Sequence, residues 1–127
     1  MIRTVPAGVE AVTTRSDASP WSEHMGYLDQ LEDLFKTIDL SIPTIIAGDF
    51  NQRVPRVSQP NRVADRLAAV LDGWTTHTAG SLPHGPHIDH IATTAHLICR
   101  SKTDWPGADA EGRLSDHSGV LCRFDQA

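Results

Sequence analysis

The stretch of sequence that decides the fold lies between residues 44 and 51 and reads TIIAGDFN. Its first half is a short, continuous apolar run bounded by turn-forming residues, which predicts a strand buried on both faces. Its second half, residues 48–51, places the carboxylate of Asp49 just past that strand, where an open α/β sheet forms its site. There Asp49 can take or orient a proton of a water molecule, and Asn51 can donate to an anionic oxygen. The same residues also favour an ordinary turn, so the stretch alone leaves both interpretations open.

Two amphipathic helices are predicted to flank this strand. Apolar residues recur at threes and fours from Glu23 to about Ile38, and Ser22 is placed to cap that helix. After the strand, Asn61 is placed to cap a second helix, which Gly73 ends. Further strands are predicted at 9–13, 74–78, 87–93, 96–100 and 119–124, with a turn at 83–86. This order predicts an α/β fold in which helices cover a mixed sheet.

Two more segments carry polar side chains at predicted strand ends, IDH at 88–90 and SDHSGV at 115–120. Because side chains alternate along a strand, Asp89 is expected to face away from His90, and a carboxylate in an apolar strand needs a polar partner. Taken separately, the first segment also fits an exposed edge strand and the second a polar turn. Taken together, an Asp89 that accepts a hydrogen bond from His117 would fix the imidazole tautomer and favour its protonated form. Such a cation beside a phosphoryl group stabilises the negative charge that develops in a transition state.

GDFN, IDH and SDHSGV, in this order and each near a strand end, resemble the C-terminal motifs of the endonuclease/exonuclease/phosphatase superfamily, which includes DNase I. The resemblance covers about residues 21–124. It implies a DNase I-like four-layer α/β sandwich. It also implies a Mg²⁺- or Mn²⁺-dependent phosphoesterase, that is, a nuclease, another phosphodiesterase or a phosphatase. Carboxylates together with an Asn suit these hard cations, which prefer oxygen ligands.

The resemblance also implies a role for each motif residue. Asp49 would orient or deprotonate the attacking water, and Asn51 would contact the scissile phosphate. Asp89 would hold His117, which would donate to a phosphate oxygen. The metal ligands implied are Asp49, Asn51 and Asp116.

The chain departs from the family pattern on its N-terminal side. Family members carry an Asn on their first strand and a later metal-binding Glu, and neither is identified here, since Glu10 lies too close to the Asp49 motif. The His that usually ends the strand before the long helix is missing from residues 14–17. We therefore expect the C-terminal half of the domain, arising from a truncated gene, a misplaced start codon or one subunit completed by another chain. Half of this fold would expose an apolar sheet face, so we expect a homo-oligomer or poor solubility.

Length and charge set broader expectations. The 127 residues are predicted to form one domain over 1–127. The formal net charge is −5, which argues against a domain that holds nucleic acid by a broad basic face. A phosphate-ester substrate, nucleic acid included, remains the expected partner. The N-terminus lacks an apolar core of signal-peptide length, which predicts a cytoplasmic protein.

One local basic stretch is an exception to the acidic balance. Its arginines are opposed only by Asp65, and the stretch fits a contact with a phosphate backbone as well as a solvated helix face. Its members are Arg53, Arg56, Arg62 and Arg66.

Three other interpretations stay open at this point. A zinc module would need three nearby histidines on one face, although alternation turns two of them to opposite faces and no cysteine lies near; they are His84, His87 and His90. A serine hydrolase would use Ser115 or Ser118 with His117, but the chain has no G-x-S-x-G elbow. A catalytically impaired half-domain or interaction protein would keep the motifs without the N-terminal Glu.

Overall fold

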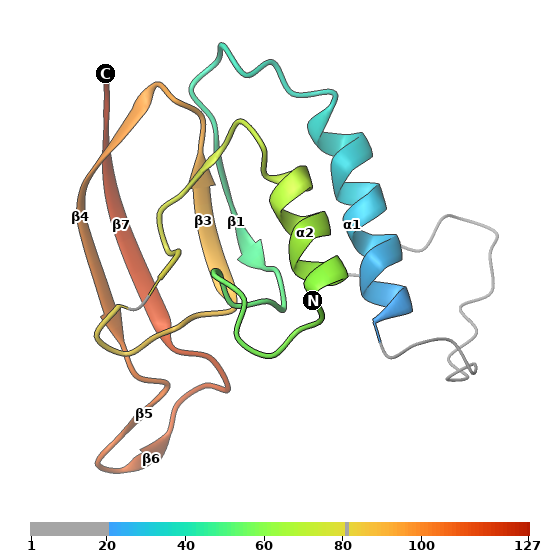
Figure 1. Cartoon of the computed structure of the whole chain (residues 1–127). Coiled ribbons are helices and arrows are strands. Elements are labelled where there is room, and N and C mark those ends of the chain that lie inside the picture. The colour runs from blue at the N-terminus through green and yellow to red at the C-terminus, as the bar shows by residue number, and fades with distance from the viewer. Residues whose placement is uncertain (1–20, 81) are drawn as a thin grey trace, which may run out of the picture.

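The structure of the chain, a computed structural model, describes residues 21–80 and 82–127 (Figure 1). In these residues two helices accompany three antiparallel sheets, and the predicted α/β class is confirmed. The strand predicted at 9–13 lies outside the described residues. The helices are α1 (Ser22–Phe35) and α2 (Asn61–Val70). The first sheet has the order β1-β3-β2, with β1 (Ile45–Asp49), β3 (Asp89–Thr93) and β2 (Thr75–Thr76). The other two are β4 (Leu97–Trp105) with β7 (Gly119–Gln126), and β5 (Ala108–Asp109) with β6 (Gly112–Arg113).

The elements are arranged in layers around β1 and β3. In Figure 1 both helices lie on one side of β1 and β3, and the β4–β7 ribbon lies on the other. The first sheet contacts the helices through Ile46 of β1, which packs against the core cluster that the helices share. It contacts the β4–β7 ribbon through His77, just after β2, whose ring lies 4.9 Å from the ring of Phe124 in β7. The first sheet is therefore covered by helices on one face and approached by the second sheet on the other.

The helices form because each presents a regular apolar stripe to a shared core. Burial of one such large side chain stabilises a fold by roughly 1.5–3 kcal/mol. The buried cluster consists of Leu28, Phe50, Leu67, Val70 and Leu71. Neither helix, among those in the described part of the chain, has the length and apolar character needed to cross a membrane.

Each helix begins one residue earlier than predicted, and α1 ends at Phe35 instead of at about Ile38. Trp21 and Pro60 occupy the N-cap positions, and neither makes a side-chain capping hydrogen bond. The caps predicted at Ser22 and Asn61 are therefore wrong, because both residues already lie inside the first turn. Pro60 has an extended backbone, with ψ of 148°, and so directs the chain into α2 without a side-chain cap. Gly73 follows α2 in the left-handed region, with φ of 86°, as expected of a residue that ends a helix.

The prediction that the strand at 44–47, which is β1 in the structure, is buried on both faces is wrong. Ile45 is 51% exposed, whereas its neighbour Ile46 packs against the helices. Within the described residues β1 pairs with β3 alone, so it is an edge strand with one covered face. Ile98 of β4 and Leu121 of β7 are also exposed. Apolar sheet surface is thus exposed as expected, and self-association stays a prediction.

The remaining strands match their predicted positions but not all of their lengths. β4 continues to Trp105, beyond the predicted 96–100, because its polar second half pairs with β7 on the surface. A register shift between Cys99 and Ser101 interrupts this ladder. β5 and β6 were not predicted. All pairings in the described residues are antiparallel, where a mixed sheet was expected.

Candidate active site

The ends of β1 and β3 bring two carboxylates face to face. The antiparallel register pairs Asp49 with Asp89, and both residues are half-buried. Residues directly opposite in such a ladder have Cβ atoms about 4.5–5.5 Å apart. The loop before β7 adds His117, so that one ligand atom from each residue lies within 4.8 Å of the other two. The structure therefore gathers all three predicted motifs at one end of the first sheet.

The imidazole of His117 is oriented by Asp89. Its Nδ1 donates to Asp89 Oδ2 over 2.5 Å, and the side chains are 35% and 29% exposed. This hydrogen bond, followed by the charge of Asp89, raises the pKa of His117 above its ordinary value of 6.5. Because Nδ1 is bound to the carboxylate, Nε2 is the ring atom left to donate to a substrate. The contact expected between these residues is present, while its catalytic role stays a prediction.

The GDFN turn aims the carboxylate of Asp49. The backbone N–H of Asn51 donates to Asp49 Oδ1 over 2.8 Å, and Asn51 has φ of 54°, a left-handed conformation that Asn tolerates. Between them Phe50 is buried in the core, and its N–H donates to the carbonyl of Ile88 over 2.9 Å. The turn interpretation and the catalytic one are therefore compatible, since the turn holds Asp49 at the sheet edge.

Asp116 lies apart from this group. Its side chain is 82% exposed and accepts a hydrogen bond from Arg113 Nη1 over 3.3 Å. Adjacent side chains of the loop point in different directions, and the inward position is taken by His117. The charge of Asp116 still contributes to the raised pKa of His117, as the last of several causes. As a metal ligand Asp116 stays a prediction that lies outside the convergent group.

A buried polar network supports the site loop, and the sequence analysis did not predict it. His90 Nε2 donates to the carbonyl of Gln52 over 2.7 Å, and Thr78 Oγ1 donates to His90 Nδ1 over 2.7 Å. The amide nitrogen of Gln52 donates to His24 Nε2 over 2.8 Å, since that nitrogen cannot accept. Burial lowers the pKa of both histidines, so both are neutral near pH 7. Alternation along the strand predicted only that His90 faces away from Asp89, and its partners lie far away in the chain.

The zinc interpretation fails on these contacts. His90 is committed to Gln52 and Thr78, whereas His87 donates to Asp104. Within the described residues, the side chains that could jointly hold a metal ion are those of Asp49, Asp89 and His117.

The serine hydrolase interpretation fails as well. Ser115 Oγ accepts from the backbone N–H of His117 over 3.2 Å, while the imidazole itself is turned to Asp89. A nucleophilic serine would have to donate to that ring.

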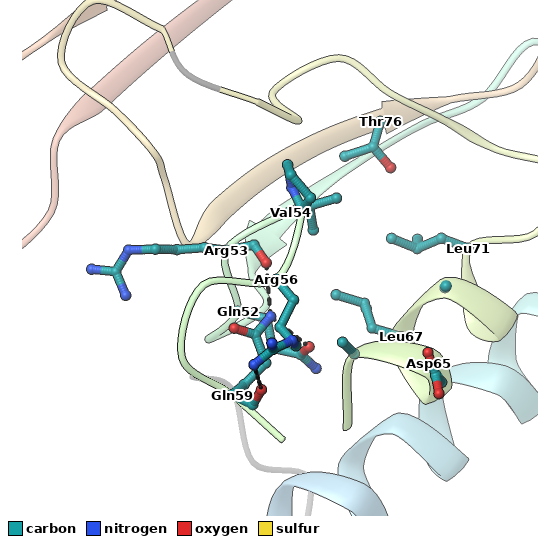
Figure 2. Close-up of a pocket in the computed structure, with 12 residues that line it drawn as sticks. Gln52, Arg53, Val54, Arg56, Gln59, Asp65, Leu67, Leu71 and Thr76 are labelled. Carbon is teal, nitrogen blue, oxygen red and sulfur yellow. Dashed lines mark hydrogen bonds between the residues drawn. The ribbon is translucent and has the colours of Figure 1, made fainter. Parts of the chain in front are cut away.

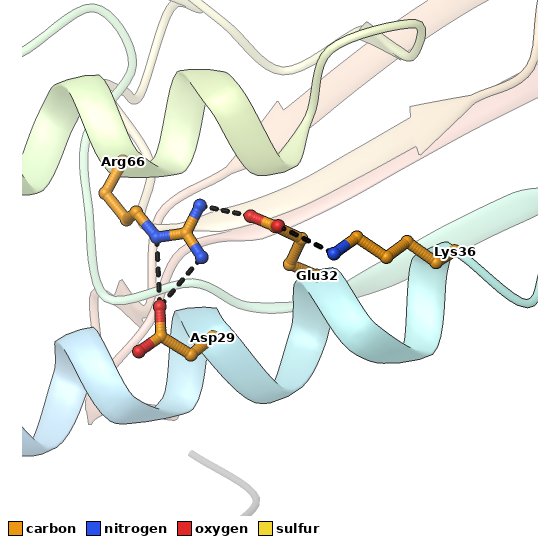
Figure 3. Close-up of polar contacts among 4 residues, drawn as sticks. All are labelled: Asp29, Glu32, Lys36 and Arg66. Carbon is orange, nitrogen blue, oxygen red and sulfur yellow. Dashed lines mark hydrogen bonds and ion pairs between the residues drawn. The ribbon is translucent and has the colours of Figure 1, made fainter.

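The basic stretch does not form one continuous face. Arg66 pairs with Asp29 and Glu32 of α1, and Lys36 pairs with the same Glu32 (Figure 3). This part of the stretch joins the two helices.

Two other arginines of the stretch line a cavity of about 290 Å³ between the loop after β1 and α2 (Figure 2). Arg56 Nη1 donates to the carbonyl of Gln59 over 3.1 Å, whereas the guanidinium of Arg53 points away from the other labelled residues. The floor of the cavity is mainly apolar, from Val54, Leu67 and Leu71. The Arg53 end of the stretch therefore retains the predicted character of a basic surface beside the site loop.

Comparison with known proteins supports the same assignment as the motifs. The sequence model of the Endonuclease/Exonuclease/phosphatase family matches residues 2–117, which include all three clustered side chains. No curated protein and no solved structure gave a significant match. The family comprises hydrolases of phosphate esters that generally depend on a divalent cation. The chain belongs to the endonuclease/exonuclease/phosphatase family.

Proposed function

We propose that the chain is a divalent-metal-dependent hydrolase of phosphate esters whose active site contains Asp49, Asn51, Asp89 and His117. The observation that carries the proposal is the convergence of two carboxylates and one imidazole within 4.8 Å, from three separate segments. A pair of like charges directly opposite each other in a sheet is destabilising, and a bound cation beside protonated His117 would compensate it. Ligand binding, rather than folding stability, accounts for such a cluster.

The donor set fits Mg²⁺ or Mn²⁺. Hard cations prefer oxygen ligands, and the cluster supplies two carboxylates with an amide close by. Asp49 and Asn51 would hold the ion, with Asp116 as a further predicted ligand from the loop before β7. When bound, the ion supplies positive charge that polarises the phosphoryl group and favours attack at phosphorus.

The protein's own groups divide the remaining tasks. Asp49 takes a proton from the attacking water as its oxygen forms a bond to phosphorus, and the bond from phosphorus to the leaving oxygen breaks. Asn51 donates to a phosphate oxygen. Protonated His117, aligned by Asp89, donates from Nε2 to a phosphoryl oxygen and stabilises the charge that develops there.

The test is hydrolysis of bis-p-nitrophenyl phosphate and p-nitrophenyl phosphate by the purified chain, with Mg²⁺, Mn²⁺ or EDTA. We expect metal-dependent turnover that Asp49→Asn abolishes and that Asp33→Asn, the same change at an exposed position of α1, leaves intact. Turnover in EDTA equal to that with metal would exclude the proposed chemistry. No turnover in a folded sample would instead support the catalytically impaired half-domain or interaction protein.

A further inference from the structure

A second His–Asp pair lies buried behind the proposed site. His87 Nε2 donates to Asp104 Oδ2 over 2.9 Å, and the two side chains are 2% and 1% exposed. The backbone N–H of His84 donates to the same oxygen over 2.8 Å. Burial by itself would raise the pKa of Asp104, but these hydrogen bonds outweigh it and hold the pKa below its ordinary value. Asp104 is therefore an ionised acceptor whose Oδ2 is held in place by two donors.

This pair connects two sheets that are separate in the described part of the chain. His87 lies two positions before Asp89, where the chain enters β3. Asp104 lies near the end of β4, opposite Val120 of β7. The contact therefore sets the start of β3 relative to the ribbon that follows the His117 loop.

The loop that carries His117 is hydrogen-bonded to the chain just after β4, close to Asp104. The backbone N–H groups of Leu114 and Ser115 both donate to the carbonyl of Gly107, over 2.7 and 2.9 Å. A Cβ on Gly107 would lie 2.7 Å from the carbonyl oxygen of His117, so the two backbones are in close contact. A displacement of β4 at Asp104 is therefore passed on to His117.

The Asp89–His117 contact cannot fix this alignment by its own burial, because both side chains are about one-third exposed. The second pair is fully enclosed, yet a buried hydrogen-bonded polar pair contributes little net stability compared with an apolar pair. Its Asp104 Oδ1 is buried without a hydrogen-bond partner among the described residues, which adds an unmet desolvation penalty. The pair therefore contributes to the orientation of β3 relative to β4 more than to the stability of the fold.

The geometry points to His87 and Asp104 as positioning residues that hold Asp89 and His117 at hydrogen-bonding distance. The inference rests on the proposed function, because the contact that it positions belongs to the proposed active site. A misplacement of about 1 Å at reacting groups reduces turnover by roughly 100-fold. The buried pair would therefore control turnover without touching the substrate.

The experiment combines a double variant, a conservative variant and a matched control. His87→Leu/Asp104→Leu replaces the buried polar pair by an apolar pair, which is often neutral for stability. His87→Gln keeps a side-chain N–H that can reach Asp104. His77→Gln makes the same change in a different contact between the sheets, where the ring of His77 packs on Phe124.

Two measurements are made on each protein. The first is kcat and KM for bis-p-nitrophenyl phosphate. The second is the pair of ¹⁵N chemical shifts of the His117 ring, recorded at a pH above the pKa of His117 so that the ring is neutral; these shifts report its tautomer and hydrogen bond without any turnover. In the double variant we expect kcat to fall by about tenfold to 100-fold with KM little changed, and the ring shifts to move towards a tautomeric average. In His87→Gln and His77→Gln we expect both measurements to stay close to wild type.

The inference is overturned if the folded double variant keeps wild-type kcat and ring shifts, or if His77→Gln disturbs His117 equally. Should the double variant not fold, the isosteric variant Asp104→Asn tests the inference instead, because it weakens the hydrogen bonds from His87 and from the backbone of His84 without changing the size of the side chain. Wild-type values in that variant then overturn the inference. If every protein, wild type included, lacks turnover, the proposed function fails, while the ring shifts still decide whether the buried pair positions His117.

Discussion

Nδ1 of His117 lies 2.5 Å from Oδ2 of Asp89, although the two residues are 28 positions apart. One belongs to the start of β3 and the other to the loop before β7, so the contact joins two sheets. It also occupies one ring nitrogen of His117 and leaves the other, Nε2, to donate to a substrate. The proposed chemistry depends on this orientation more than on any property of the imidazole alone.

Asp89→Asn should lower the pKa of His117 towards its ordinary value of 6.5, because the hydrogen bond and charge of Asp89 are the largest causes of the raised value. Since the folded pKa is raised, this contact stabilises the fold below pH 6.5, and the contribution is lost as pH rises through the folded pKa. An NMR titration of the His117 ring measures the shift. Asp116→Asn is the control and should have a smaller effect, because its charge is the last cause. An unchanged titration in Asp89→Asn would contradict the electrostatic role of the contact.

His117→Ala should abolish phosphate-ester hydrolysis while leaving the thermal midpoint nearly unchanged. The side chain is 35% exposed and lies outside the apolar core, so its removal leaves no large cavity. Activity assays with Mg²⁺ and thermal unfolding of the same samples check both parts. His96→Ala, which removes an exposed imidazole between β3 and β4, should retain activity. Wild-type turnover in His117→Ala would remove this residue from the mechanism.

The free energy of unfolding should fall as pH drops below 6.5, because His90 is neutral in the fold. Burial is the main reason that its pKa is lowered, and its Nδ1 accepts from Thr78 only while that nitrogen is unprotonated. The unfolded chain binds the proton near pH 6.5, so stability is complete above this pH and is lost towards the lower folded pKa. Urea unfolding at a series of pH values measures the slope, and His90→Gln should flatten it. An equal slope in that variant would assign the acid sensitivity to other groups.

Arg66→Met should destabilise the packing of α1 on α2 only slightly, since its ion pairs lie at the surface and are screened by solvent. The guanidinium pairs with Asp29 and Glu32 across the two helices, and the effect should shrink in high salt (Figure 3). Lys36→Met is the matched control, because Lys36 contacts Glu32 within its own helix and should contribute less. Urea unfolding at low and high salt compares the variants. A loss that does not depend on salt would mean that Arg66 acts through its apolar stem.

The local elements were predictable because their signals lie within a few neighbouring residues. The apolar spacing around Leu28 predicted α1, and that around Leu67 predicted α2. The position of β1 followed from the apolar run at 44–47, although the strand continues through Asp49 instead of ending before it. The motif around His117 belongs to the same class of local pattern. The family assignment rests on such patterns, and the match over residues 2–117 agrees with it.

The exposure of β1 and the capping of the helices could not be predicted, because both depend on which segments lie beside them in the folded chain. A continuous apolar run is the same whether one face or both faces of its strand are covered, and here Ile45 is exposed. The cap residues depended on how the backbone at Trp21 and Pro60 turns into each helix.

The sequence by itself determined the fold class, the family and the three segments that carry the site, because these follow from local spacing and residue chemistry. The tertiary structure alone decided that Asp49 meets Asp89 across the ladder, that Asp116 turns outward, and that His87 pairs with Asp104 17 positions away. Such contacts depend on register and on the packing of one sheet against another. Neither leaves a mark in the spacing of neighbouring residues, because the partners are brought together only when the whole chain is folded.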